Sequence, residues 1–527
     1  MPKIALSFVL YLLIFSSVLY AYLLFSAQWV HIANANLKEL FKLEIPLLFL
    51  GALFLYLPSK NKKLLLALLS TATLLLLYII FDLFYSFLMR SPQLSDFTNI
   101  TLIWDFDPLL SLGAFALLFL LLFLLSYPLY IFYKEYGKKS FLRILTLKVS
   151  LLLAAFFYLQ TPSFAKHLNK RLSYFHWSQK VTIQKSGRLS SFLYYSSQSF
   201  LAAKELQNYK NRDLNVTAEL FGNFTIEKPR NIYIIALESF VDPRLIRGTA
   251  YNKDPLSEKL KPYLYQNNFS FVRSPVYGGD TAQAEFEILT GIKAFAKINS
   301  IEFNLFEGGH IPGFVDLLQQ NGYKTYAAIA PSPIYFNAKT AYQSIGFDAI
   351  LYLSYEDEKI FDSELFRRSL EFIKKKNPKQ PYLYYNLGMY GHHPYKRDYE
   401  KRPSVIEVKH KDHRVKKVAN MFHFRTDSLA NYLKDLLAYD PSSIILVTSD
   451  HLPPLFDKGL NYTKDLHTNI AFMLVEGKPQ NIDGLHYYEY AYKILSYLGK
   501  TKEFEALQAK STSLDLYYKA LSQTLRN

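Results

Sequence analysis

The sequence predicts an N-terminal transmembrane bundle of about five helices followed by an extracytoplasmic α/β domain with a mostly parallel central sheet. Residues 1–160 are almost continuously apolar, whereas residues 229–500 alternate between short apolar strands and helical segments. The chain has 527 residues, which is too long for one ordinary domain. Lys and Arg gather in two short loops between the apolar runs, and this bias indicates how the bundle is oriented.

The composition narrows the class of protein further. The chain is 50% hydrophobic, has a net charge of +16 and contains no cysteine. Disulfides, thiolate metal sites and cysteine nucleophiles are therefore excluded. The basic excess suits a surface that lies against anionic lipid. Nucleic acid is the competing partner for such a charge, but the apolar spans argue against it, so we expect no nucleic-acid binding.

The apolar runs of residues 1–160 mostly approach or exceed the roughly 20 residues that cross a bilayer. They cover Ile4–Phe25, Leu43–Leu57, Leu64–Met89, Leu109–Tyr133 and Ile144–Leu159. The first run is too long for a signal peptide and lacks a small-residue cleavage pattern. Lysines within 60–63 and 134–139 mark cytoplasmic loops. Five crossings from an inside N-terminus place everything after about residue 160 outside the cytoplasm, so we expect a multi-pass protein of the cytoplasmic (inner) membrane.

The remaining chain is expected to form a connector, a catalytic domain and a tail. Residues 161–228 mix Lys and Arg with aromatic residues, which predicts amphipathic helices along the membrane surface; plain packing helices fit the pattern equally well. Residues 229–500 alternate between strands and helices, which predicts the mostly parallel sheet. The expected elements are strands Ile232–Leu237, Lys324–Ile329, Tyr382–Tyr385 and Ile444–Thr448 and helices Pro312–Gln320 and Val415–Leu437. Residues 501–527 are expected to be a polar helical tail.

The stretch Ser274–Gly291 is the part of the catalytic domain around which the other motifs are organised. Gly278 and Gly279 permit backbone angles that are closed to other residues. An apolar helical face follows and is expected to stop at Gly291. Thr281 lies where the loop becomes a helix, and the free N–H groups of a helix start favour an anion there. A simple helix cap is the alternative role for Thr281.

Polar groups also follow the predicted strands, at the places where functional groups gather in a parallel α/β sheet. Glu238 ends the first strand, Asp450-His451 follows the strand that begins at Ile444, and His392 follows the strand that begins at Tyr382. With the Thr281 hydroxyl, two carboxylates and an imidazole make a site suited to manganese or zinc, with magnesium as a further alternative. Metal coordination is one way to activate a threonine hydroxyl, which is otherwise a poor nucleophile. Each group taken alone also fits a loop cap or a solvated side chain.

At Asn231–Ser239, Ser274–Gly291 and Thr448–His451 the chain resembles the lipoteichoic acid synthase branch of the sulfatase/alkaline phosphatase superfamily, whose members are phosphoglycerol transferases. The run Tyr-Gly-Gly-x-Thr-Ala-x-x-Glu-Phe-Glu-x-Leu-Thr-Gly is highly specific, and the resemblance covers essentially the whole chain. It implies a sulfatase-like domain, a bacterial membrane and one divalent cation, usually manganese. It also implies that Thr281 is the nucleophile and that His392 faces the substrate phosphate. The implied metal ligands are Glu238, Thr281, Asp450 and His451.

The resemblance is incomplete at the positions where family members bind the glycerophosphate. Related synthases often carry a histidine where this chain has Ala330-Pro331, and a Trp-Asn-Arg group where it has Phe336-Asn337-Ala338. Phe336 and Asn337 of this group are the expected substrate-binding residues together with His392. His467 is added to them, with an ordinary loop residue as the alternative, because related transferases use a histidine near this position. The missing imidazole and guanidinium leave the head group and the product open.

The function that the resemblance implies is a two-step transfer of glycerophosphate. Thr281 attacks the phosphorus of phosphatidylglycerol, diacylglycerol leaves, and a hydroxyl of an envelope glycan or glycolipid then attacks the phosphothreonine. A phosphoethanolamine transferase acting on lipid A or an envelope glycan is the closest alternative. A catalytically inactive sensor or scaffold for envelope assembly is the alternative of another class. Sulfate ester hydrolysis is disfavoured, because Thr281–Glu285 lacks the Cys/Ser-x-Pro-x-Arg setting that it needs.

Overall fold

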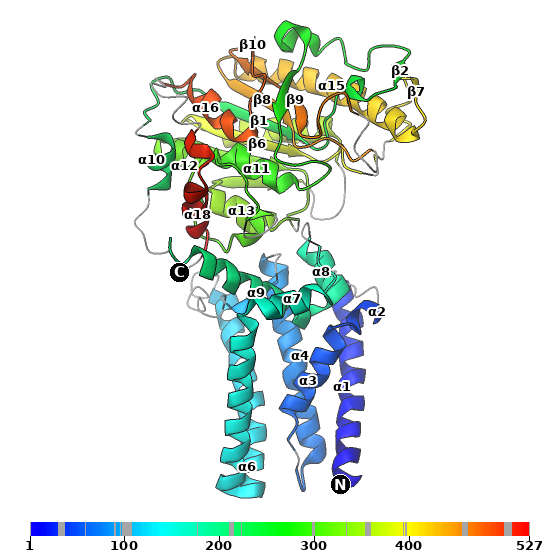
Figure 1. Ribbon diagram of the computed structural model, residues 1–527, viewed down its shortest axis with the longest axis vertical. Helices are drawn as coiled ribbons and strands as arrows, with labels where there is room; N and C mark the ends of the chain where they lie inside the picture. The colour runs from blue at the N-terminus through cyan, green and yellow to red at the C-terminus, as the bar shows by residue number, and fades with distance from the viewer. Residues whose placement is uncertain are drawn as a thin grey trace. The chain divides into compact units, whose positions relative to one another are not determined.

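The chain forms two compact units, Met1–Glu205 and Leu206–Asn527. Figure 1 shows the elements of each unit in the computed structural model. The structure describes residues 2–29, 37–57, 59–88, 91–94, 96, 108–175, 178–209, 215–222, 224–297, 301–333, 335–353, 360–393, 395, 398–455, 462–499 and 509–525.

The first unit is helical. Its described helices are α1 (Pro2–Trp29), α2 (Leu37–Leu40), α3 (Glu44–Leu55), α4 (Lys63–Leu88), α6 (Pro108–Leu159), α7 (Pro162–Asn169), α8 (Gln179–Ser186) and α9 (Arg188–Leu206). Two stretches, Lys63–Ser86 and Leu112–Leu159, are long and apolar enough to cross a membrane, and Tyr11–Ser26 and Glu44–Leu55 are shorter apolar helices. Two candidate spans are therefore present by length and composition, and the five-helix bundle stays a prediction.

Gly137 breaks α6 into two helical arms. Its backbone, at φ 77° and ψ 172°, leaves the helical region, and glycine adopts this conformation at little steric cost. The ring centroids of Tyr133 and Phe141 lie 5.4 Å apart, whereas eight residues of continuous helix would rise about 12 Å. The chain therefore turns back within the lysine-rich segment that the sequence predicts as a loop, and Figure 1 shows the two arms.

Charged side chains are buried inside the first unit. Arg188, at the start of α9, pairs with Asp82 of α4 at 2.6 Å, and their side chains are 1% and 0% exposed. Glu44 of α3 accepts hydrogen bonds from the backbone N–H groups of Leu189 and Ser190 at 3.0 and 2.7 Å. A carboxylate therefore caps the N-terminus of α9, where the helix dipole favours it, and these bonds tie α9 to α3 and α4.

The second unit is an α/β domain. Its described strands are β1 (Ile232–Leu237), β2 (Ala250–Tyr251), β3 (Ser270–Arg273), β4 (Lys324–Ile329), β5 (Ala349–Tyr352), β6 (Tyr382–Gly388), β7 (Val408–Lys409), β8 (Ile444–Ser449), β9 (Thr468–Val475) and β10 (Lys478–Gln480). Its described α-helices are α10 (Val216–Phe221), α11 (Thr281–Thr290), α12 (Phe314–Gln320), α13 (Ala338–Ile345), α14 (Asp362–Lys376), α15 (His413–Tyr439), α16 (Tyr490–Leu495) and α18 (Leu514–Ser522). The strands and helices predicted from the sequence are confirmed, with ends that differ by a few residues.

Within the described residues, the main sheet has eight strands in the order β10-β9-β8-β1-β6-β4-β5, with β3 paired to β9. The strands from β8 to β5 are parallel to their neighbours. β9 is antiparallel to β8, and β3 and β10 are antiparallel to β9. The sheet predicted as mostly parallel is therefore mixed. β1 lies in its parallel part and is buried along its whole length, as expected for a parallel strand covered on both faces.

Helices cover both faces of this sheet (Figure 1). On one face, Phe422 and Leu433 of α15 join Tyr233 and Ile235 of β1 in a single buried hydrophobic cluster. On the other face lies α11, where the hydroxyl of Tyr385 on β6 donates a hydrogen bond to Glu285 at 2.9 Å. α15 and α11 therefore pack on opposite faces of the parallel part of the sheet.

The two compact units divide the chain between Glu205 and Leu206, and the predicted domain boundaries stay predictions. The first unit ends at Glu205, so it contains α7 to α9 of the expected connector, while α10 packs against α12 and α18 in the second unit. In α18, Tyr517 is fully buried and donates a hydrogen bond to Glu302 at 3.0 Å. The described part of the expected tail therefore packs into the α/β unit, because the apolar side of α18 is buried there.

Candidate metal centre and active site

Two strand ends and one helix start bring four of the predicted side chains together. Glu238 directly follows β1, Asp450 and His451 follow β8, and Thr281 is the first residue of α11. β1 and β8 are parallel neighbours in register, so the residues that follow them lie at the same edge of the sheet. Gly291 ends α11 in the left-handed conformation, at φ 73°, as the sequence predicts for a glycine stop.

The four side chains meet within hydrogen-bond range. The Thr281 hydroxyl oxygen lies 2.8 Å from Asp450 Oδ2 and 3.2 Å from Glu238 Oε2. His451 Nε2 lies 3.5 Å from Glu238 Oε1 and 3.3 Å from Asp450 Oδ2. One ligand atom from each of these two carboxylates and the imidazole lies within 4.8 Å of the others. Thr281 is the most exposed of the four, at 9%, so the cluster is a buried site.

The surrounding hydrogen bonds orient the possible metal ligands. His451 Nδ1 lies 3.0 Å from the carbonyl oxygen of Leu452, a contact that needs a hydrogen on Nδ1. In the neutral ring Nε2 then carries the lone pair, as in metal-binding histidines. The Ser239 hydroxyl donates to Glu238 Oε1 at 2.8 Å, and its N–H donates to Asp450 Oδ1 at 2.7 Å. Ser239 has φ 50°, a left-handed conformation that is uncommon without glycine.

The charges of the cluster favour a cation. Burial and the neighbouring charge of Glu238 raise the pKa of Asp450 to about 7. Burial lowers the pKa of His451, but the charges of Asp450 and Glu238 outweigh this effect and its pKa is raised. Two carboxylates this close do not both ionise without a compensating charge. The donor set of two carboxylates, one imidazole and one hydroxyl therefore fits a divalent cation such as manganese, zinc or magnesium.

His392 lies in the turn that follows β6. Its N–H donates to the carbonyl of Met389 at 3.2 Å, and its Nδ1 lies 2.7 Å from the carbonyl oxygen of His393. The preceding residue, Gly391, packs against the end of β1: a Cβ atom there would lie 1.9 Å from the carbonyl oxygen of Glu238. Only glycine allows this approach, so the turn that carries His392 lies directly beside the segment that carries Glu238.

Phe336 and Asn337 occupy the turn before α13. Asn337 is 4% exposed, and its amide donates to the carbonyl oxygens of Phe303 and Phe306 at 2.9 and 2.8 Å. The Asn337 amide therefore holds the loop that contains Phe303 and Phe306. Phe336 and Asn337 have φ values of 51° and 56°, and such backbone strain is common at functional sites. Their contact with substrate stays a prediction.

His467 contacts the start of the nucleophile stretch. Its Nδ1 lies 3.1 Å from the carbonyl oxygen of Ser274, and the N–H of Ser274 donates to the carbonyl of His467 at 2.9 Å. The Ser274 hydroxyl in turn donates to the carbonyl oxygen of Asp450 at 2.7 Å. His467 is exposed and is linked to the cluster through Ser274, and its role at the substrate stays a prediction.

Two residues that contact the predicted ligands are not among those expected from the sequence. One is Ser239, which nothing in the sequence distinguishes from any residue after a strand. The other is Arg425 of α15, whose Nη1 donates to the carbonyl oxygen of Glu238 at 2.8 Å. A signal for Arg425 was available: it falls between Phe422 and Leu429 on the apolar face of the predicted helix, where a charge is rare unless it is paired.

A protein-family model described as Sulfatase matches residues 230–495 of this chain. Among curated proteins, one from Rhizobium meliloti (strain 1021), named for cyclic beta-1,2-glucan modification, is 27% identical over 236 residues. That match covers 43% of this chain and 36% of the relative. The matched segment therefore spans little more than a third of the length of the curated relative.

Solved structures similar to this chain come from several bacteria. The lipoteichoic acid synthase LtaP from Listeria monocytogenes is 18% identical, with a TM-score of 0.44 over 60% of this chain and 81% of that one. The phosphoglycerol transferase GacH from Streptococcus pyogenes, in complex with sn-glycerol-1-phosphate, is 19% identical, with a TM-score of 0.45 over 62% of this chain and 92% of that one. Similarity at this level assigns no activity.

Proposed function

This chain belongs to the sulfatase family, whose model matches residues 230–495, and we propose that it is a metal-dependent phosphoglycerol transferase of a bacterial cytoplasmic membrane. The proposed donor is phosphatidylglycerol, and the proposed acceptor is a hydroxyl of an envelope glycan or glycolipid. The resemblance of Ser274–Gly291 to the lipoteichoic acid synthase branch supports the transferase. The curated relative's name, which refers to modification of a glucan, supports a glycan as the acceptor.

One observation carries the proposal: the Thr281 hydroxyl lies 2.8 Å from Asp450 Oδ2 and 3.2 Å from Glu238 Oε2 in a buried cluster. A hydroxyl in this position can act as a nucleophile toward phosphorus. Sulfate ester hydrolysis in this superfamily needs a Cys or Ser that is converted to formylglycine, and threonine cannot supply it. Phosphoryl transfer through a threonine ester is therefore the chemistry that this site supports.

The residues that would hold the cation are Glu238, Asp450, His451 and Thr281. When bound there, a divalent cation neutralises negative charge that develops on the phosphoryl and threonine oxygens. The chain itself orients the nucleophile, because the Thr281 hydroxyl is held by two carboxylates and by its place at the start of α11. The α11 N-terminus adds free N–H groups beside the same oxygen.

In the proposed first step, Thr281 Oγ1 forms a bond to phosphorus while the phosphorus–oxygen bond to diacylglycerol breaks. The hydroxyl hydrogen passes to a carboxylate of the cluster, and the leaving oxygen takes up a proton. His392 is the proposed donor of that proton or a hydrogen-bond donor to the phosphate. In the second step an acceptor hydroxyl oxygen forms a bond to phosphorus while the bond between phosphorus and Thr281 Oγ1 breaks. The acceptor's proton passes to His392, and the proton held by the cluster carboxylate returns to Thr281 Oγ1, so the site regains its starting state.

The test is to incubate the purified full-length protein in detergent with labelled phosphatidylglycerol or labelled phosphatidylethanolamine, with Mn²⁺, Zn²⁺ or Mg²⁺ in turn. We expect free diacylglycerol from phosphatidylglycerol, and a glycerophosphate adduct on the peptide that contains Thr281 when no acceptor is present. Release from phosphatidylethanolamine alone would instead assign a phosphoethanolamine transferase. No release from either lipid would overturn the transferase.

Thr281→Ala is the matched control, because it removes the hydroxyl and leaves the carboxylates and the imidazole in place. The variant is expected to release no diacylglycerol, to form no adduct and to fail to complement a deletion strain. An inactive scaffold would still complement with this substitution. Complementation by Thr281→Ala would therefore favour the scaffold over the enzyme.

A further inference from the structure

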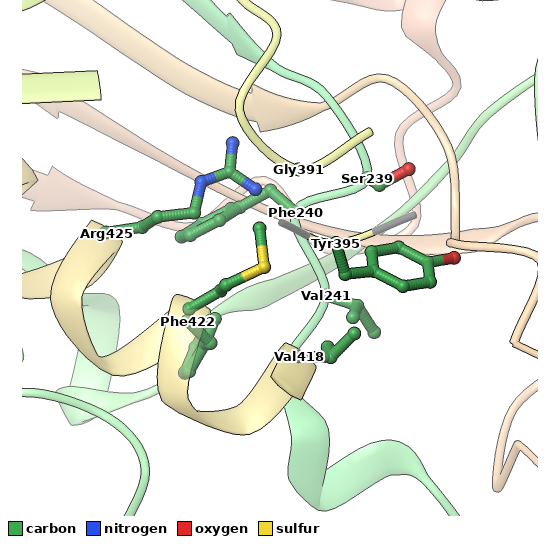
Figure 2. A pocket seen from close by; sticks show the side chains of 9 residues that line it. Ser239, Phe240, Val241, Gly391, Tyr395, Val418, Phe422 and Arg425 are labelled. Atoms are coloured by element: carbon green, nitrogen blue, oxygen red, sulfur yellow. The ribbon is translucent and has the colours of Figure 1, made fainter. Parts of the chain in front are cut away.

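The guanidinium of Arg425 lies behind the metal centre rather than in it. Arg425 projects from α15 and is 2% exposed. Together with Ser239, Phe240 and Gly391 it lines a small pocket beside the end of β1, and Figure 2 shows its guanidinium over the Phe240 side chain. The guanidinium carbon lies 5.1 Å from the centroid of the Phe240 ring. The long side chain is therefore held in one place by the residues that follow Glu238.

Arg425 fixes the peptide group between Glu238 and Ser239. Its Nη1 donates to the carbonyl oxygen of Glu238 at 2.8 Å. This carbonyl lies beyond the end of β1, where the ladder to the neighbouring strands stops. The next residue turns to φ 50° and directs its N–H to Asp450. Rotation of this one peptide group would therefore move the Glu238 carboxylate and also break the bond between Ser239 and Asp450.

The same guanidinium limits the position of the turn that carries His392. A Cβ atom built on Gly391 would lie 1.9 Å from the carbonyl oxygen of Glu238 and 2.4 Å from Arg425 Nη1. Gly391 is thus packed against the hydrogen bond that joins the two groups. Arg425 therefore connects the segment that carries Glu238, a predicted metal ligand, with the turn that carries His392, the histidine predicted to face the phosphate.

The charge of Arg425 is cancelled by Asp362 of α14. Arg425 Nε donates to Asp362 Oδ2 at 2.6 Å, and the side chains are 3% and 0% exposed. Among the described residues, Arg425 Nη2 and Asp362 Oδ1 have no hydrogen-bond partner. A buried pair with unsatisfied atoms adds little to stability, and apolar replacements of such pairs are often neutral or stabilising. The geometry therefore indicates orientation, rather than stability, as the contribution of this pair.

We propose that Arg425 is a positioning residue of the metal centre, which holds Glu238 through its carbonyl oxygen and holds the His392 turn through Gly391. Arg425 contacts neither substrate nor ion in this role. The inference rests on the proposed metal site, but it does not depend on which lipid or acceptor the protein uses. Loss of partners behind metal ligands typically lowers metal affinity by about 10- to 100-fold, and we expect this range for Arg425.

The experiment measures the Kd for Mn²⁺ by the EPR signal of free Mn²⁺ in titrations of the purified full-length protein, with thermal unfolding in EDTA as a second readout. Arg425→Lys keeps the charge beside Asp362 but lacks the fork that reaches two acceptors. The double variant Asp362→Asn/Arg425→Met removes both buried charges. For both we expect a Kd about 10- to 100-fold above that of the wild type, with unfolding in EDTA close to that of the wild type.

Leu433→Ala is the control for a general loss of packing, because Leu433 lies on the same helix and in the hydrophobic cluster that α15 forms with β1. It is expected to lower the unfolding temperature and to leave the Kd for Mn²⁺ unchanged. If the two Arg425 variants bind Mn²⁺ as tightly as the wild type, or if Leu433→Ala weakens binding equally, the positioning role is wrong. A wild type that binds none of Mn²⁺, Zn²⁺ and Mg²⁺ overturns the metal centre and, with it, this inference.

Discussion

Replacing Asp450 with asparagine is expected to stabilise the metal-free protein relative to the wild type and to remove most of the stabilisation that metal binding gives the wild type. The substitution preserves the shape of the site. An asparagine Oδ1 can still accept from the N–H groups of Ser239 and His451, which contact Asp450 Oδ1 at 2.7 and 2.6 Å. Its Nδ2 replaces the oxygen beside Thr281, and that hydroxyl can rotate to accept a hydrogen bond.

The magnitude follows from the pKa of Asp450, which burial and the charge of Glu238 raise from 3.8 to about 7. The folded state then prefers the neutral carboxyl. The contribution of Asp450 to the free energy of unfolding is therefore fully present below pH 3.8, and it is lost as the pH rises through 7. At about 1.4 kcal/mol for each pKa unit, the loss at pH 8 is on the order of 4 kcal/mol. Asparagine is neutral at every pH and escapes this loss.

The assay is unfolding of the full-length protein in detergent, followed by intrinsic fluorescence, in EDTA at pH 8 and pH 5 and in excess Mn²⁺ at pH 8. In EDTA at pH 8 Asp450→Asn should be the more stable protein, and at pH 5 the difference should shrink. A metal at 100 times its Kd adds about 2.7 kcal/mol to the wild type, and the variant should lose most of this gain. Asp450→Asn less stable than the wild type in EDTA at pH 8 would refute the reasoning.

Three further substitutions test other parts of the structure. Burial raises the pKa of Glu287 to about 8, although the hydrogen bond from the N–H of Ala294 acts in the opposite direction. The contribution of Glu287 to stability therefore falls as the pH rises toward 8. Glu287→Gln should flatten the dependence of the unfolding temperature on pH between 5 and 9. Arg188→Met leaves Asp82 buried and unpaired and should cost the first unit about 3–5 kcal/mol, measured by urea unfolding in detergent, with recovery in the double variant that also carries Asp82→Asn. His392→Gln should slow diacylglycerol release by about 10²- to 10⁴-fold with no change in the Kd for Mn²⁺; weaker Mn²⁺ binding would contradict its predicted place at the phosphate.

The strand ends of the site could be predicted because each is marked by a change of chemistry within a few residues. The apolar run of β1 stops at Glu238, and the run of β8 stops before Asp450 and His451. Parallel strands place such residues at one edge of a sheet, so the sequence alone indicates that they meet. The start of α11 at Thr281 was also predictable, because a glycine pair precedes it and Gly291 ends it.

Other features depend on contacts that no local pattern encodes. β9 runs antiparallel to β8, and the apolar pattern of a buried strand does not itself reveal its direction relative to its neighbour. β3 is only four residues long and is stabilised by pairing with β9. Asn337 stays a predicted substrate-binding residue, and no local pattern reveals that its amide donates to two backbone carbonyls of another segment. Arg425 could be identified as a buried charge from the sequence, but its partners lie in distant segments.

The charge balance of the site links metal binding to the state of the nucleophile. A cation held by Nε2 of His451 would keep that imidazole neutral while Nδ1 donates to Leu452, and Asp362 pairs with Arg425, so the two carboxylates of Glu238 and Asp450 leave a charge that one divalent cation neutralises. Without the cation, a proton on Asp450 relieves the repulsion instead. Metal and proton therefore compete, and the Kd for Mn²⁺ should rise by up to about tenfold for each pH unit below 7. A Kd that is constant from pH 8 to pH 5 would contradict this coupling. If the coupling holds, metal binding keeps Asp450 ionised, 2.8 Å from the Thr281 hydroxyl, where it can accept the hydrogen that the nucleophile must lose.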